Sequence, residues 1–392
     1  MFTGRLVRQG DSIGVQVDLI NVADGSQIWG YHYDQKLSDL MTLAENISGK
    51  ISERLQLKLS ASEQKSLSRG RTENQEAFRL YLLGRYHWNQ RLDGRPGTVE
   101  KAIGYFQQAI EKDPLYAMAY VGMSEAYATL PSYSQTPARD AAIKGKAAAR
   151  KALEIDDTVS EAYVALASIA ADEWEWPEAG KAFQRALELN RGYATVHQWY
   201  ATYLDAMGRP REALAEAQQA YELDPLSPSI SIGLGAAWYH ARQYERAIEQ
   251  FRKTLELNPD FGAVHLHSGV VRLAQGKPKE ALLDFNRAKA LMPGSPPLAL
   301  IGYAQAQLGN RQAALELLRQ ISDPAKRQKG TGFELAVLYM GLGDKDRAFE
   351  YLNQACDERA PLMVLLKVDP LFAPLRSDRR YVSLLRRMNL TP

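Results

Sequence analysis

Histidines and carboxylates are the residues of this chain whose types could bind a metal ion or move a proton. Of the six histidines, His265 and His267 lie nearest to one another. Residues two apart on a helix point in different directions, whereas a zinc-binding helix spaces its histidines by four. Asp172, Glu173 and Glu175 surround two tryptophans, a grouping more typical of a helix-to-helix connection than of a paired-carboxylate site. We therefore expect neither a metal site nor an acid–base site.

The remaining motifs that could bind a nucleotide or carry out catalysis are absent or are better explained by helix packing. The Gly-x-Gly of residues 233–235 has no strand before it and falls inside a predicted helix. The sequence contains no P-loop, kinase signature or Gly-x-Ser-x-Gly elbow. Cys356 is the single cysteine, which excludes an intramolecular disulfide, and its place beside Ala355 in a helical pattern indicates burial. We expect no enzyme, with no catalytic residue, cofactor, bound metal or small-molecule substrate.

Charge and hydrophobicity narrow the class of partner. The 48 basic and 46 acidic residues leave a net charge of +2, so no overall field attracts nucleic acid or an anionic membrane. The longest strongly apolar run, residues 361–366, is too short to span a bilayer. Residues 1–10 lack the apolar core of a signal peptide. We expect a cytoplasmic protein whose partners are neither nucleic acids nor membranes.

The elements that would position these residues repeat along the chain. A small residue and a proline each recur at intervals of 34 residues. The two series are Ala213, Ala247 and Ala281, and Pro225, Pro259 and Pro293. Two independent markers with one period indicate stacked helical hairpins. Small residues let two helices approach, Phe183, Phe251 and Phe285 fill the space toward the next unit, and proline ends the second helix.

The two ends of the chain depart from this period. Residues 2–34 predict a three-stranded meander with Gly30 interrupting the third strand, and a helix is expected from Ser38 to Leu59. The exposed sheet edges of residues 2–34 are expected to be open to pairing with another strand. At the other end, Asp369-Pro370 and Ala373-Pro374 should break helices before a short helix over 381–388. The arginines of this segment are expected to form a solvated face: Arg376, Arg379, Arg380, Arg386 and Arg387.

The predicted fold is mostly α: a right-handed superhelical solenoid of helix pairs preceded by a small, partial α/β module. We assign residues 1–60 to that module, 61–75 to a linker, 76–361 to about eight helix pairs and 362–392 to a C-terminal capping segment. A cap is needed because the last repeat of a solenoid would otherwise expose an apolar face.

Two resemblances support this division. The helix pairs resemble tetratricopeptide repeats. The start of the chain resembles the end of a TolB-amino-terminal-like (FlgO-like) domain through the following residues: Gly4-Arg5, Gln9-Gly10-Asp11, Val17-Asp18-Leu19-Ile20, Asp24-Gly25, Trp29 and Tyr33-Asp34. The resemblance implies a bacterial protein. In proteins similar to this one, the domain follows a kinase, cyclase or winged-helix module and precedes tetratricopeptide repeats.

Tetratricopeptide repeats imply a scaffold that binds a protein or peptide along the concave face of the first helices. Projection of the repeat places ten residues there: Val164, Ser168, Gln198, Trp199, Thr202, Ile232, Ala236, Leu266, His267 and Val270. The set contains no Lys or Asn, so a clamp for a terminal carboxylate is not supported. An amphipathic helix or extended peptide near Trp199 fits better, although Trp199 fits an inter-repeat core equally well. The alternative function is a sensory or regulatory region of a bacterial kinase, adenylate cyclase or transcription regulator whose catalytic or DNA-binding module lies outside this chain.

Overall fold

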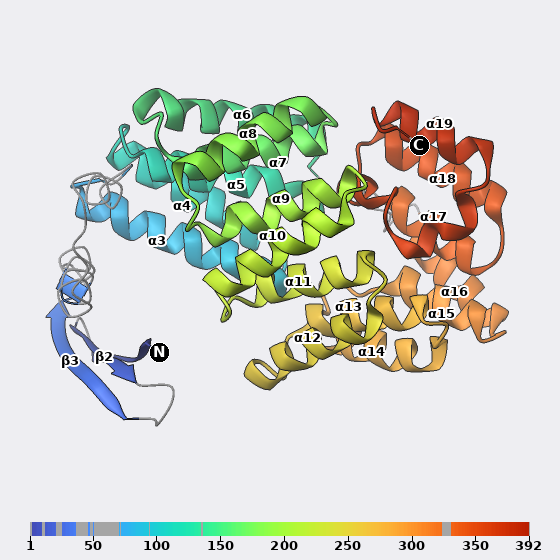
Figure 1. Cartoon of the computed structure of the whole chain (residues 1–392), viewed down its shortest axis with the longest axis horizontal. Coiled ribbons are helices and arrows are strands. Elements are labelled where there is room, and N and C mark those ends of the chain that lie inside the picture. Colours follow the sequence, from blue (N-terminus) through green and yellow to red (C-terminus); the bar gives the residue numbers. More distant parts are fainter. Residues whose placement is uncertain are drawn as a thin grey trace.

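The computed structural model describes residues 2–9, 12–20, 26–36, 46–47, 50, 70, 72–93, 95–134, 136–323 and 331–391. Most of these residues are helical, and the helices follow one another in pairs along a curved array (Figure 1). This arrangement confirms the predicted class, a mostly α, right-handed solenoid preceded by a small sheet.

Eight helix pairs are present in the described part of the chain, each a first helix followed by a second. In chain order they are α3 (Gln75–Asn89) and α4 (Thr98–Lys112); α5 (Ala117–Thr129) and α6 (Ala138–Ile155); α7 (Ser160–Asp172) and α8 (Trp176–Leu189); α9 (Ala194–Ala206) and α10 (Pro210–Leu223); α11 (Pro228–His240) and α12 (Tyr244–Leu257); α13 (Gly262–Ala274) and α14 (Pro278–Leu291); α15 (Leu298–Gln307) and α16 (Arg311–Ser322); and α17 (Thr331–Gly341) and α18 (Lys345–Asp357).

Contacts between small and large side chains hold each pair together. Ala247, near the start of α12, is 0% exposed, and Phe251, one turn later, is 1% exposed. The Phe251 ring lies so close to Gly235 of α11 that a Cβ atom built there would be 2.1 Å from its Cε1 atom. Gly269 and Phe285 repeat this contact in the next pair. The periodic glycines therefore make room for aromatic rings of the same pair, and the Phe251 ring also contacts His267 of the next pair, the direction that the sequence predicted.

A left-handed residue ends the first helix in most of the pairs. The series is Trp174, Gly208, Arg242, Gly276, Gly309 and Gly343, with φ between 60° and 81°. A residue in this conformation satisfies the last carbonyl groups of a helix and reverses the chain, and glycine adopts it without steric cost. Two of the turns use side chains other than glycine, so the turn geometry is set by the repeat rather than by the local residue.

The N-terminal strands β1 (Phe2–Gln9), β2 (Ser12–Ile20) and β3 (Gln27–Lys36) form the predicted antiparallel meander. The expected interruption at Gly30 is wrong, because β3 runs through it and pairs it with Asp18. A Cβ atom on Gly30 would meet only the ends of two flexible side chains, Gln27 Nε2 at 2.1 Å and Asp18 Oδ1 at 2.5 Å, which can move aside. Most of the predicted helix over 38–59 lies outside the described residues; residues 46–47 and 50 are helical.

The C-terminal segment consists of the 3₁₀ helices η4 (Pro361–Leu365) and η5 (Pro370–Leu375) and of α19 (Arg379–Arg387). Pro370 starts η5, and Asp369 caps it by accepting a hydrogen bond from the Leu371 N–H at 2.9 Å. The expected break at Pro374 is wrong, because this residue lies inside η5. A 3₁₀ helix this short has few internal hydrogen bonds for a proline to remove.

Four of the five C-terminal arginines form the expected exposed face: Arg379, Arg380, Arg386 and Arg387 are exposed, and Arg376 is half-buried. Arg380 contacts Asp346 at 2.7 Å and Asp378 at 2.8 Å. Arg387 contacts Asp357 at 2.5 Å, and Arg376 donates to backbone carbonyls of the same segment. Acidic partners supplied by α18 and by the start of α19 orient these exposed guanidinium groups.

The same segment closes the array on itself, as Figure 1 shows where the C-terminal elements lie beside the ends of α7 and α9. The indole Nε1 of Trp176 donates to the Met388 carbonyl at 2.7 Å in a buried contact. The Tyr239 hydroxyl donates to Asp369 Oδ1 at 2.6 Å, and the Arg359 guanidinium lies 4.4 Å from the Trp174 ring centroid. One hydrophobic cluster therefore joins the middle of the chain to its end.

Candidate binding site on the concave face

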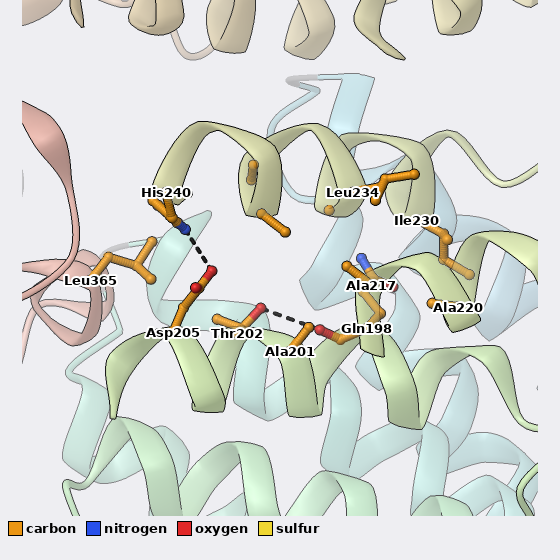
Figure 2. Close-up of a pocket in the computed structure, with 13 residues that line it drawn as sticks. Gln198, Ala201, Thr202, Asp205, Ala217, Ala220, Ile230, Leu234, His240 and Leu365 are labelled. Atoms are coloured by element: carbon orange, nitrogen blue, oxygen red, sulfur yellow. Dashed lines mark hydrogen bonds and ion pairs between the residues drawn. The ribbon is translucent and has the colours of Figure 1, made fainter. Parts of the chain in front are cut away.

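A pocket opens between α9 and α11, on the side where the sequence predicted a groove (Figure 2). Its volume is about 420 Å³, including space that is open to solvent. The predicted groove residues Gln198, Thr202 and Ala236 all line it. The remaining lining residues are Ala201, Asp205, Ala217, Ala220, Ile230, Gly233, Leu234, Ala237, His240 and Leu365.

Small side chains create this space. Ala201 of α9, Ala217 of α10 and Ala237 of α11 all line it, and larger residues at these positions would fill it. Gln198 fixes the separation of the two first helices, because its Nε2 donates to the Ser229 carbonyl at 3.1 Å and to the Ser229 hydroxyl at 3.0 Å. Leu365, at the end of η4, forms one end of the pocket.

Asp205 and His240 form a buried polar pair at the same end (Figure 2). The distance from His240 Nδ1 to Asp205 Oδ2 is 2.6 Å, and their side chains are 6% and 5% exposed. The second carboxylate oxygen, Asp205 Oδ1, is buried without a hydrogen-bond partner in the described structure. A buried polar atom in this state is uncommon in folded proteins, because its desolvation is not offset.

The surroundings shift the protonation of these groups. Burial raises the pKa of the Asp205 carboxyl, and the hydrogen bond with His240 opposes that rise. Burial favours neutral His240, but the hydrogen bond and charge of Asp205 outweigh it, so the pKa of His240 is raised. The short contact between His240 Nδ1 and Asp205 Oδ2 favours an ion pair of protonated His240 and ionised Asp205, so the raised pKa of His240 is the stronger effect. Burial and His240 lower the pKa of His267 to about 4.

The other predicted groove residues do not join this pocket. Val164 is 2% exposed, and Ser168 donates its hydroxyl proton back to the Val164 carbonyl at 3.0 Å. Trp199 packs against the cluster that contains Phe183 and Val196, as the inter-repeat alternative described. His267 contacts the Phe251 ring, with centroids 6.0 Å apart.

The chain itself covers part of the concave face. Leu266 and Val270 of α13 pack against the cluster that contains residues of η5. From the opposite direction, the 3₁₀ helix η2 (Gln90–Asp93) follows α3 and contacts α13, where its Leu92 packs against the cluster that Ile232 also contacts. None of these covered residues lines the pocket between α9 and α11.

The motifs first considered for chemistry occupy structural positions. His265 lies 3.9 Å from Asp284 while His267 faces Phe251, so the two rings have different neighbours. In the described residues no three His, Cys, Asp or Glu side chains gather as a metal site requires. Asp172 and Glu173 lie at the turn between α7 and α8, and Cys356 is 3% exposed, which confirms its predicted burial.

Asp205 was not among the predicted site residues. Asp205 and His240 lie 35 residues apart, one repeat plus one, so repeat alignment places them on neighbouring first helices. That alignment could have paired them, but nothing in it distinguishes a buried carboxylate from the many exposed ones. Trp199, in contrast, was predicted as a groove residue and packs in the core between repeats.

Fold and site together define a helical-repeat solenoid with a pocket on its inner face. Two family models, both described as tetratricopeptide repeat, match residues 201–260 and 239–296 in one case and 333–360 in the other. The chain therefore contains tetratricopeptide repeats, as the sequence predicted. Proteins with such repeats are generally scaffolds for protein interaction.

Curated relatives share this region at low identity. Transcriptional regulator HilA of Salmonella typhimurium is 26% identical over 162 residues, which cover 41% of this chain and 29% of HilA. Superkiller protein 3 of Schizosaccharomyces pombe is 24% identical over 46% of this chain and 13% of its own length. Tetratricopeptide repeat protein 37 of Xenopus laevis is 25% identical over 60% and 14%. The chain spans less than a third of each of these relatives.

Solved structures are similar in fold. A monomeric IFIT1 mutant solved with m7Gppp-AAAA superposes with a TM-score of 0.50 at 15% identity, covering 78% of this chain and 74% of IFIT1. PilW, a type IV pilus biogenesis factor, superposes with a TM-score of 0.44 at 20% identity, covering 55% and 96%. In the described part of the chain, no helix has the length and apolar character needed to cross a membrane.

Proposed function

We propose that this protein is a non-enzymatic interaction scaffold that binds a peptide or an amphipathic helix on the concave face of its solenoid, in the pocket between α9 and α11. The observation that carries the proposal is that Gln198, Thr202 and Ala236, from two successive first helices, line one pocket. A groove between first helices suits an extended or helical peptide, because alternate side chains can enter pockets while its backbone follows the groove.

The contacts that the chain makes with its own concave face support the same position. Leu266 and Val270 pack against the cluster of the C-terminal segment, and Leu92 packs against the cluster that Ile232 also contacts. A ligand therefore has its best access at Thr202, an exposed residue on α9 beside the pocket. In this proposal the partner is a cytoplasmic protein, and neither nucleic acid nor a membrane surface is involved.

A crosslinking experiment identifies and tests the partner. A photoreactive amino acid at Thr202 should capture it, whereas the same group at Leu257, which is 66% exposed on the second helix α12, should not. The captured protein is then purified, and its affinity for the full chain is measured by calorimetry. Thr202→Trp and Ala236→Trp should each weaken binding at least about tenfold by filling the pocket, and Leu257→Trp should leave it unchanged. Equal affinity for all three variants rules out the concave site.

As a second function we propose the regulatory region of a longer bacterial signalling protein. The partial match to the transcriptional regulator HilA favours a regulator over a kinase or cyclase. Sequencing of the genomic DNA upstream tests this: an in-frame DNA-binding or catalytic module supports it, and a stop codon directly before Met1 counts against it. The assignment of residues 1–60 to a TolB-like module, with edges open to strand pairing, belongs to this proposal.

A further inference from the structure

We propose that the pocket between α9 and α11 recognises a lysine side chain of a partner peptide, with its ammonium group at Asp205 Oδ1 and its aliphatic stem along the alanine-rich walls. This inference rests on the proposed function, because it specifies which residue of the bound peptide enters the pocket.

The unpaired carboxylate oxygen indicates a hydrogen-bond donor as ligand. Asp205 is 3% exposed and lines the pocket, its Oδ2 contacts His240, and its Oδ1 has no partner in the described structure. A carboxylate oxygen can only accept hydrogen bonds, so the group that satisfies it must carry an N–H or O–H. A charged donor forms a stronger bond to a carboxylate than a neutral one does.

The walls of the pocket favour an amine on a long aliphatic stem. Ala201, Ala217, Leu234 and Ala237 present methyl groups along its length, and the carboxylate lies at one end (Figure 2). A lysine side chain has this distribution, four methylene groups followed by a charge. Arginine fits less well, because its planar guanidinium forms parallel bonds to two acceptors and only one oxygen of Asp205 is free.

The charged and titratable groups around the carboxylate are His240, His267, Asp369 and Lys367. His240 and Asp205 cancel one another when His240 is protonated, and Asp369 of the C-terminal segment adds a negative charge that acts on His240. His267 is neutral near pH 7, because its pKa lies at about 4. Lys367 lies over Gly208, beyond the end of α9. A bound ammonium would therefore occupy Asp205 Oδ1 while His240 remains at Oδ2.

Two capped amino acids test the charge preference. Nα-acetyl-lysine N-methylamide and the corresponding norleucine compound have stems of similar length, but only the first carries an ammonium group. Methyl NMR of the full chain follows Ile230, Leu234 and Leu365 during titration with each probe. We expect the lysine probe to shift these signals with an affinity at least about tenfold higher than that of norleucine. Equal affinities, or no shift of these methyl groups, would overturn the proposal.

Substitutions then test whether Asp205 supplies the negative charge that favours lysine over norleucine. Asp205→Asn keeps the side-chain shape but removes the negative charge, and it should abolish the preference for lysine over norleucine. Asp224→Asn, at an exposed position after α10, is the matched control and should preserve it. If Asp205→Asn changes the methyl spectrum throughout, Ala236→Leu tests the site with Asp205 intact, and it should block both probes. A lysine preference that survives both pocket variants contradicts the assignment.

The same measurements distinguish a failure of the lysine proposal from a failure of the proposed peptide-binding function. If the lysine preference is absent but Thr202→Trp still weakens binding of the purified partner, the groove binds a peptide through other residues. If Thr202→Trp has no effect either, both proposals are wrong.

Discussion

At the scale of single residues, the packing of a first helix against its second helix depends on the absence of one methyl group. A Cβ atom on Gly235 would lie 2.1 Å from Phe251 Cε1, whereas one on Gly104 of α4 meets nothing within 4 Å. We predict that Gly235→Ala lowers the free energy of unfolding by about 1–3 kcal/mol despite the better helix propensity of alanine. Gly104→Ala should raise it by about 0.5–1 kcal/mol. Urea unfolding measures both, and equal signs would contradict the packing.

A second residue-scale prediction concerns His197, which is 7% exposed. Its Nδ1 lies 2.6 Å from Glu216 Oε2, and its Nε2 lies 2.9 Å from the Arg191 carbonyl. Both oxygens accept hydrogen bonds, so both ring nitrogens donate and the imidazolium is favoured. Burial alone would lower the pKa of His197, but these bonds outweigh it and the pKa is raised.

A raised histidine pKa adds stability that is complete below the unfolded pKa of about 6.5 and is lost as the pH rises through the folded pKa. We therefore predict that His197→Gln destabilises the protein more at about pH 5.5 than at about pH 8.5. Chemical unfolding at both pH values measures the difference. His32→Gln, at a side chain that is 60% exposed, is the control and should show a smaller dependence. A loss of stability at His197 that does not change with pH would contradict the double donation.

At the scale of elements, the turn between two helices tolerates different residues for different reasons. Arg242 and Trp174 occupy positions where the other repeats have glycine, with φ of 60° in both cases. Arg242 is exposed, so its side chain contributes little to offset the left-handed strain. Trp174 is 4% exposed and packs under Arg359, so burial offsets the strain there.

We predict that Arg242→Gly raises the free energy of unfolding by about 0.5–1 kcal/mol, because glycine removes the strain at some cost in chain entropy. Trp174→Gly should lower it by about 3–5 kcal/mol, since the loss of a buried aromatic side chain dominates. Thermal unfolding monitored by circular dichroism gives both signs. A destabilised Arg242→Gly protein would show that this arginine has a structural role that its exposure does not indicate.

The elements also show how far the sequence determines the site. Ala247 and Phe251 are spaced for contact within one repeat, so their burial followed from the 34-residue period. The contact between Tyr239 and Asp369 spans 130 residues and follows from no period. Small rotations between repeats add up along a solenoid, and the sequence does not specify their sum closely enough to predict which distant helices meet. The burial of Asp205 depends partly on that closure, because Leu365 forms the adjacent wall.

At the scale of the whole molecule, closure distinguishes this protein from an open solenoid. In an open array each repeat contacts its neighbours alone, so a local defect affects local stability. Here Trp176, at the start of α8, donates its indole N–H to the Met388 carbonyl at 2.7 Å, and the two side chains belong to one buried cluster. The C-terminal segment and the middle repeats should therefore open together.

We predict that Trp176→Phe, which leaves the Met388 carbonyl buried without a donor, increases hydrogen exchange both in α7–α9 and in residues 361–391. Trp199→Phe is the matched control, because Trp199 packs between the repeats, in a cluster apart from the one that holds the C-terminal segment. Its effect should stay within α7–α9. Hydrogen exchange with mass spectrometry measures both patterns on the full chain. If Trp176→Phe leaves exchange in residues 361–391 unchanged, the middle repeats and the C-terminal segment open independently, and closure does not couple the pocket between α9 and α11 to the end of the chain.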